Sequence, residues 1–223
     1  MGYNIDLNKI SILKYMEILK SQNPLPGRRI LLENIEENFR KITDTGIHSL
    51  AELKNSISSK QKLSIFPQKT NIDENYLTIL KREIGSLEQK PIPVSDFPGI
   101  SAGTLSALEN QGIKTSKDVY NLSINPGNIS SVSRKTGIKT SELLEINIMS
   151  NLVRINGIGT AAAKAIYESG YKSIDDIAHA KAAKLLEKMN TANANKQYYK
   201  ANLGEKDMQF IIDAAKIILD TDI

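Results

Sequence analysis

The apolar residues of this chain recur at helical spacing over most of its length, and no stretch gives a convincing strand. The spacing predicts an amphipathic N-terminal helix over residues 7–21, a second helix whose apolar stripe stops at Gly46, and a C-terminal helix over residues 205–219. The fold class expected from this pattern is all-α. The apolar positions that define these three helices are Leu7, Ile10, Leu13, Met16 and Leu19, then Ile35, Phe39 and Ile42, and finally Met208, Ile211, Ile212, Ala215 and Ile218.

One short phrase occurs three times in the chain, starting at Gly46, Gly112 and Gly170. Each copy has a glycine suited to a helix C-cap, an apolar residue, a Ser or Thr suited to a helix N-cap, and an acidic residue three positions later, which is the spacing of a capping box. The second copy follows the first by 66 residues, and the third follows the second by 58. Sequence repetition at this scale predicts an internal triplication of a helical unit.

The triplication also predicts the domain organisation. At the 66-residue offset, residues 69–72 (KTNI) align with residues 135–138 (KTGI), so each repeat is expected to hold a further helix, a short turn and a closing helix. In the third repeat, additional residues placed within 191–199 precede the closing helix. Prolines in residues 86–96 favour an extended linker there. We expect a helical domain at 1–90 with a divergent first repeat, and a tandem pair of units at 91–223, namely 91–149 and 150–223.

Residues 152–167 have the pattern of one helix end, a Gly-Ile-Gly hairpin and the start of a second helix. Gly157 and Gly159 permit backbone angles that a side chain forbids. Ile158 is expected to point between the two helices, and Ala163 allows their close approach. This stretch resembles the helix-hairpin-helix motif of DNA ligases, branch-migration proteins and repair nucleases.

A second, degenerate hairpin lies 58 residues earlier, at Gly99, with Ser101 in place of the second glycine and Leu105 in place of the small alanine. Over its whole length the chain also resembles an uncharacterised bacterial family of degenerate helix-hairpin-helix repeats of the sterile-alpha-motif-like type. The phrases that carry this resemblance are PGRRILLENIEENF, YLTILKREIGSLEQKP and DFPGI. The resemblance implies three such helical units in tandem and no established activity.

Composition narrows the function classes. The absence of cysteine excludes disulfides, thiolate catalysis and cysteine-ligated metals. No apolar run approaches the roughly 20 residues that span a bilayer, and the chain begins without a basic-then-apolar signal pattern, so we expect a cytoplasmic protein with no membrane partner. The net charge of +4 is spread thinly along the chain. That charge permits nucleic-acid binding without arguing for it.

The third hairpin is the leading candidate site, for the phosphate backbone of DNA or RNA. Its glycines let a phosphate approach the backbone, and the first N–H groups of the following helix have no partners within that helix. The alternative is that Gly-Ile-Gly only makes a tight corner between two helices. The residues of this candidate site are Gly157, Gly159, Thr160, Lys164, Arg154 and Lys172, and the weaker second hairpin offers Gly99 and Ser101.

Arg28 and Arg29 form the densest basic pair and are a candidate anion contact at a predicted helix start. The alternative there is a solvated pair or an ion pair with Glu33. An enzyme is not expected. His48 and His179 are the only histidines and match no metal-ligand spacing, and no phosphate-binding glycine loop is present, so no cofactor or metal is predicted.

Two hypotheses of different class follow. The first is a non-enzymatic module that binds nucleic-acid phosphates through the third repeat, without reading bases. The second is a protein-interaction scaffold that uses the repeat surfaces and has lost phosphate binding.

Overall fold

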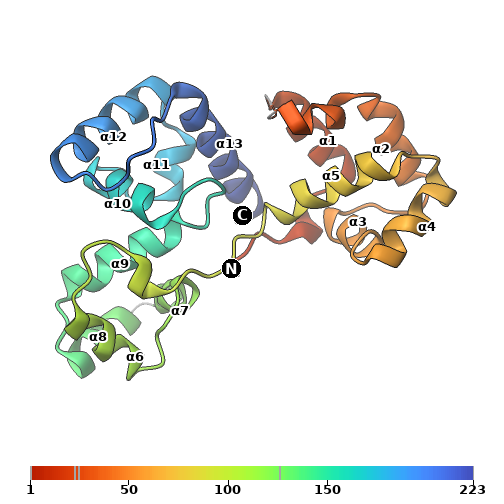
Figure 1. The fold of residues 1–223 in the computed structure, drawn as a ribbon. Helices are drawn as coiled ribbons and strands as arrows, with labels where there is room; N and C mark the ends of the chain where they lie inside the picture. Colours follow the sequence, from red (N-terminus) through yellow and green to blue (C-terminus); the bar gives the residue numbers. More distant parts are fainter. Residues whose placement is uncertain (1, 23, 25, 126, 223) are drawn as a thin grey trace. The chain divides into compact units, whose positions relative to one another are not determined.

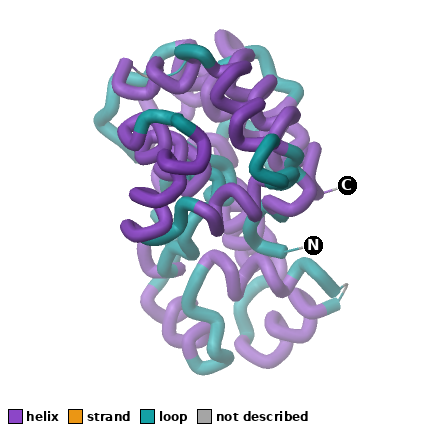
Figure 2. The backbone as a smooth tube through the Cα atoms, turned by 90° about the vertical axis from the view of Figure 1, so that its right-hand side faces the viewer, coloured by secondary structure: helices purple, strands orange, loops and turns teal. Residues whose placement is uncertain are grey.

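The computed structural model describes residues 2–22, 24, 26–125 and 127–222. These residues form helices joined by loops and turns, and none of them lies in a strand, as Figure 2 shows. The expectation of an all-α fold is therefore confirmed for the described part of the chain. No helix within that part is both long enough and apolar enough to cross a bilayer.

The chain divides into two compact units. The N-terminal unit is Ile5–Glu88, and the C-terminal unit runs from Gln89 onward and also takes in the chain up to Asn4. The helices of the N-terminal unit are the 3₁₀ helix η1 (Leu7–Lys9), α1 (Ile12–Ser21), the 3₁₀ helix η2 (Pro26–Leu32), α2 (Ile35–Thr43), α3 (Leu50–Ser56), α4 (Lys60–Thr70) and α5 (Glu74–Gly85).

The C-terminal unit holds two groups of helices joined by one long helix. The short 3₁₀ helix η3 and α6–α8 pack around α9, and α9 leads directly to the group formed by α10–α13 (Figure 1). The helices of this unit are η3 (Val94–Asp96), α6 (Ala102–Glu109), α7 (Ser116–Leu122), α8 (Asn128–Thr136), α9 (Thr140–Leu152), α10 (Thr160–Glu168), α11 (Ile174–Ala178), α12 (Ala182–Lys196) and α13 (Glu205–Asp222).

All three predicted capping boxes are present. Ser49, Thr115 and Ser173 each cap a helix by accepting a hydrogen bond from the backbone N–H three residues later, and the acidic side chain at that later position accepts one from the N-cap backbone. Each box satisfies two N–H groups that a helix start leaves without intrahelical partners. The sequence pattern is confirmed here because it encodes a contact within four residues.

A pairing that the sequence did not predict adjoins the first two boxes. Ser11 and Ser49 form an isolated antiparallel bridge, and Pro93 and Thr115 form another. In the second, the Val94 N–H donates to the Lys114 carbonyl at 2.9 Å. In both units, the segment that precedes the first α-helix of the bundle thus pairs with the residue that caps α3 or α7.

The N-terminal apolar stripe differs in part from the prediction. Ser11 caps a new helix at Ile12, so the buried positions of α1 are Ile12, Tyr15 and Leu19, and Leu13 is 58% exposed. The predicted single helix from residue 7 was wrong because the Ser11 bridge interrupts it and resets the helical register. By contrast, the buried faces predicted for α2 and α13 are confirmed.

Left-handed backbone conformations recur at regular places in the chain. The described residues with positive φ are Asn34, Asn71 and Gln197 among non-glycines, and Gly46, Gly99, Gly112, Gly127, Gly137, Gly157 and Gly170.

The additional residues of the third repeat are divided between two places. Part of them extends α12 as far as Lys196, and the rest form the loop 197–204 before α13.

Candidate functional site

The third hairpin is a tight corner between α9 and α10. After α9 ends at Leu152, the Ile158 N–H donates to the Ile155 carbonyl, and Gly157 adopts a left-handed φ of +93°. Ile158 is buried, as its expected position between the helices requires. Gly159 then begins α10 as its N-cap, with an extended backbone.

Ala163 of α10, the small residue expected at the contact with α9, has no exposed surface. We expect Ala163→Leu to lower the free energy of unfolding by about 1–3 kcal/mol, because three additional carbon atoms have no room in a packed site. Urea denaturation followed by circular dichroism measures this difference. Ala183→Leu, at an exposed position of α12, is the matched control and should change stability little. Equal stability of the two variants would show that Ala163 is not at the helix contact.

Gly157 faces α13, which the sequence did not indicate. A Cβ atom added there would lie 2.9 Å from Cε1 of Phe210 and 3.2 Å from Cγ2 of Ile211. The direction in which a Cβ atom would project from Gly157 is therefore occupied by side chains of α13, although the residue itself is exposed. The absence of a side chain at Gly157 therefore permits both the left-handed turn and the close packing of α13.

Lys164 is only 9% exposed and is paired within the protein. Its ammonium group contacts the Glu145 carboxylate from α9 and lies 2.9 Å from the Glu168 carboxylate. Burial alone would lower the pKa of Lys164, but hydrogen bonds and charge interactions with the two glutamates outweigh burial and raise it. The charge of Lys164 is thus balanced by two carboxylates rather than directed at an external phosphate.

Arg154 is also buried, at 5% exposure. Its Nε donates to the Tyr3 carbonyl at 2.7 Å, and one terminal nitrogen donates to Oδ1 of Asn151 at 2.7 Å. The guanidinium group lies over the Tyr120 ring, 4.6 Å from its centroid. Arg154 therefore joins the start of the chain to α7 and α9.

The start of α10 remains open. A Cβ atom at Gly159 would meet no atom within 4 Å, and no side chain caps the helix there. Thr160 is half-buried, and Lys172 is exposed beside the Tyr167 ring, 5.5 Å from its centroid. Of the residues proposed for phosphate binding at this hairpin, Gly157, Gly159, Thr160 and Lys172 keep accessible surface, and Arg154 and Lys164 do not.

At the second hairpin the helix start is occupied by a side chain. Gly99 has the expected left-handed backbone, and Ser101 caps α6 by accepting the Thr104 N–H at 3.0 Å. The Thr104 hydroxyl in turn donates to the Glu142 carboxylate at 2.6 Å. The chain itself supplies here an acceptor that an external anion would otherwise provide.

Arg28 and Arg29 lie in η2 and have different surroundings. Arg28 forms an ion pair with Glu83 of α5 at 2.5 Å, and not with Glu33, whereas Arg29 is exposed. Glu83 is largely buried, and this burial raises the pKa of its carboxyl group despite the opposing effect of Arg28. Of the basic pair, Arg28 is thus half-buried against Glu83, and Arg29 is left to solvent.

The Glu83 carboxyl predicts a pH effect on stability. Because its folded-state pKa exceeds the ordinary value of about 4.3, the folded protein takes up this proton first as the pH falls. Wild type should therefore gain stability relative to Glu83→Gln between neutral pH and about pH 4. Urea unfolding of both proteins across this range tests the sign. A relative loss by wild type would show that Arg28 outweighs burial.

Within the described part of the chain, no group of three or more His, Asp or Glu side chains is arranged to hold a metal ion. The sequence did not predict the residues that contact Lys164, Gly157 and Arg154 at the third hairpin, which are Glu145, Phe210 and Tyr3. Only the Lys164–Glu168 pair, at i and i+4, was readable from local spacing.

A family model described as a domain of unknown function (DUF4332) matches residues 98–218. These residues run from the turn before α6 into α13, so the match includes both hairpins and more than half of the chain. No curated protein matches the chain, and no solved structure matches it.

Proposed function

The chain belongs to the family of the domain of unknown function DUF4332, and from this premise we propose that it is a non-enzymatic protein-interaction scaffold built from three tandem helix-hairpin-helix units. The observation that carries the proposal is that both cations of the intact hairpin, Arg154 and Lys164, are buried and bonded within the protein. A hairpin of this kind stabilises a corner between helices and leaves the helix surfaces for recognition.

The left-handed residues support the threefold repeat. With the exception of Gly127, those among the described residues fall into three sets of three. One set lies at the hairpin, one precedes each capping box, and one ends the helix before each closing helix. These sets are Asn34, Gly99 and Gly157, then Gly46, Gly112 and Gly170, and finally Asn71, Gly137 and Gln197.

The set containing Asn34 extends the repeat to a place where the sequence showed no hairpin glycine. Asn34 begins α2 with a left-handed backbone, and asparagine is one of the few residues with a side chain that adopt this conformation routinely. The left-handed backbone at Asn34 therefore supports a first repeat that is built like the other two repeats, although its hairpin sequence has diverged.

The alternative function is phosphate-backbone binding at the start of α10. It draws support from the uncapped helix start at Gly159 and from the exposed Lys172. Without Lys164 and Arg154, however, few cations remain to neutralise phosphates at this hairpin, and backbone binding depends on such neutralisation.

Titrations with fluorescent single- and double-stranded DNA and RNA over a series of salt concentrations test the two functions. The scaffold predicts no saturable binding at physiological salt. Saturable binding whose logarithmic salt slope is about −2 or steeper, and which is weakened in Gly159→Val and Lys172→Ala, would favour the alternative. Lys117→Ala, at an exposed position of α7, is the control for a general loss of charge.

The scaffold also makes a positive prediction about partners. A protein captured by the intact chain should bind again when purified, after nuclease treatment, and with an affinity that changes little between low and physiological salt. Loss of the complex on nuclease treatment would show that nucleic acid, and not the protein surface, held it.

A further inference from the structure

The second repeat contains a small apolar pocket of about 220 Å³ beside its capping turn. Pro93 and Val94 come from the incoming segment, Leu105 and Glu109 from α6, and Ile113 from the turn that precedes α7. Ser95, Lys114 and Thr115 complete the lining. Small-molecule sites usually measure about 300–1,000 Å³, so this volume suits a single side chain better than a cofactor.

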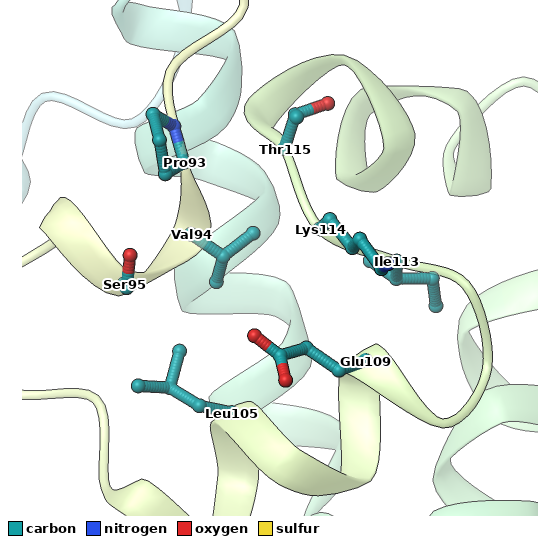
Figure 3. A pocket seen from close by; sticks show the side chains of 8 residues that line it. All are labelled: Pro93, Val94, Ser95, Leu105, Glu109, Ile113, Lys114 and Thr115. Atoms are coloured by element: carbon teal, nitrogen blue, oxygen red, sulfur yellow. The ribbon is translucent and has the colours of Figure 1, made fainter.

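The pocket has an apolar floor, formed by Val94 and Ile113, and two charged residues, Glu109 and Lys114, in its lining. Val94 and Ile113 are buried, and the hydrogen bond between the Val94 N–H and the Lys114 carbonyl fixes the two walls to each other. Figure 3 shows the Glu109 carboxylate projecting between Val94 on one side and Leu105 on the other. Neither the Glu109 carboxylate nor the Lys114 ammonium group has a hydrogen-bond or ion-pair partner among the residues that the structure describes.

The third repeat has an aromatic side chain at the position that corresponds to Glu109. At the 58-residue offset, Glu109 corresponds to Tyr167, and Lys114 corresponds to Lys172. Tyr167 is half-buried, and the Lys172 ammonium group lies 5.5 Å from the centroid of its ring. The third repeat therefore has a tyrosine ring beside its lysine, whereas the second repeat has a carboxylate at the corresponding position.

We propose that this pocket binds a tyrosine side chain of a partner protein, with the ring on the apolar floor beneath Lys114 and the hydroxyl group donating to the Glu109 carboxylate. The charges are complementary to a phenol, because a cation is attracted to the face of an aromatic ring and a carboxylate accepts a hydrogen bond from its hydroxyl group. The correspondence with Tyr167 rests on the repeat architecture and scaffold function proposed above.

The test uses the full chain labelled with ¹⁵N and two probes, N-acetyl-L-tyrosinamide and N-acetyl-L-phenylalaninamide. The tyrosine probe should shift the amide resonances of Val94, Leu105, Ile113 and Lys114 saturably, and it should bind more tightly than the phenylalanine probe. Absence of saturable shifts at these positions, or equal affinity for the two probes, would overturn the proposal.

Variants assign the two polar contacts. Glu109→Gln should weaken the tyrosine probe about two- to tenfold and leave the phenylalanine probe nearly unchanged, since only the former donates a hydroxyl hydrogen bond. Lys114→Met should weaken both probes about two- to fivefold, because both present a ring to the cation. An unchanged affinity for the tyrosine probe in either variant would contradict the contact assigned to that residue.

Glu109→Tyr gives the second repeat the residue of the third, so its own ring should fill the pocket and abolish probe binding. Ala102→Tyr adds the same ring at an exposed position of α6 outside the pocket lining and should leave binding intact. Probe binding to Glu109→Tyr at wild-type affinity would contradict the proposal. If the tyrosine probe binds but the chain has no protein partner, the pocket is a site for a phenol and the scaffold function fails together with the partner assigned to the pocket. If a protein partner binds but the probe does not, only the pocket assignment fails.

Discussion

Gly157→Ala is expected to lower the free energy of unfolding by about 2–5 kcal/mol, with two causes that add. The left-handed backbone costs a residue with a side chain about 1–2 kcal/mol, and the new Cβ would lie within 3.2 Å of both Phe210 and Ile211. Displacing these side chains of α13 adds an overpacking cost of about 1–3 kcal/mol. Chemical denaturation monitored by circular dichroism measures the total.

Two other hairpin positions separate these causes. Gly99 has nearly the same φ, +87°, but open space where the Cβ would lie, so Gly99→Ala should show the backbone cost alone. Gly159 has negative φ and open space, so Gly159→Ala should be close to neutral. The expected order of destabilisation is Gly157, then Gly99, then Gly159. Equal effects at Gly157 and Gly99 would show that α13 does not press on the third hairpin.

Arg154→Met is expected to destabilise the C-terminal unit by roughly 2–4 kcal/mol. The substitution keeps most of the apolar stem but removes the hydrogen bonds to the Tyr3 carbonyl and to Asn151, and it removes the cation above the Tyr120 ring. A buried carbonyl that loses a charged donor keeps its desolvation cost without compensation. Thermal and urea unfolding of the variant measure the loss.

Arg154→Lys distinguishes a structural arginine from a phosphate contact. Lysine keeps the positive charge but cannot reproduce the planar fork that reaches two acceptors from one position. Most of the destabilisation should therefore persist in Arg154→Lys, and Lys172→Met, at an exposed position, should cost little. Full stability of Arg154→Lys would show that only the charge matters at this site.

The sequence predicted the features whose causes lie within a few residues. Ser49, Thr115 and Ser173 cap their helices because the acidic partner of each stands three positions later. The faces of α2 and α13 were readable because burial imposes the helical period on the apolar residues. The prolines near residue 90 likewise predicted a break between helices, and residues 86–93 hold no helix.

Tertiary structure decided which side chains are available at the surface. Sequence spacing placed Lys164 and Arg154 beside the hairpin, but only the fold brought Glu145 to the first and the Tyr3 carbonyl to the second. The same holds for Leu13, which lost its predicted place on the buried face when the Ser11 bridge reset the helix. Local hydrogen bonds and helical periodicity depend on residues that are close together in the sequence. The neutralisation of a charge, or the closing of a space by Phe210, depends on groups that meet only after the chain has packed.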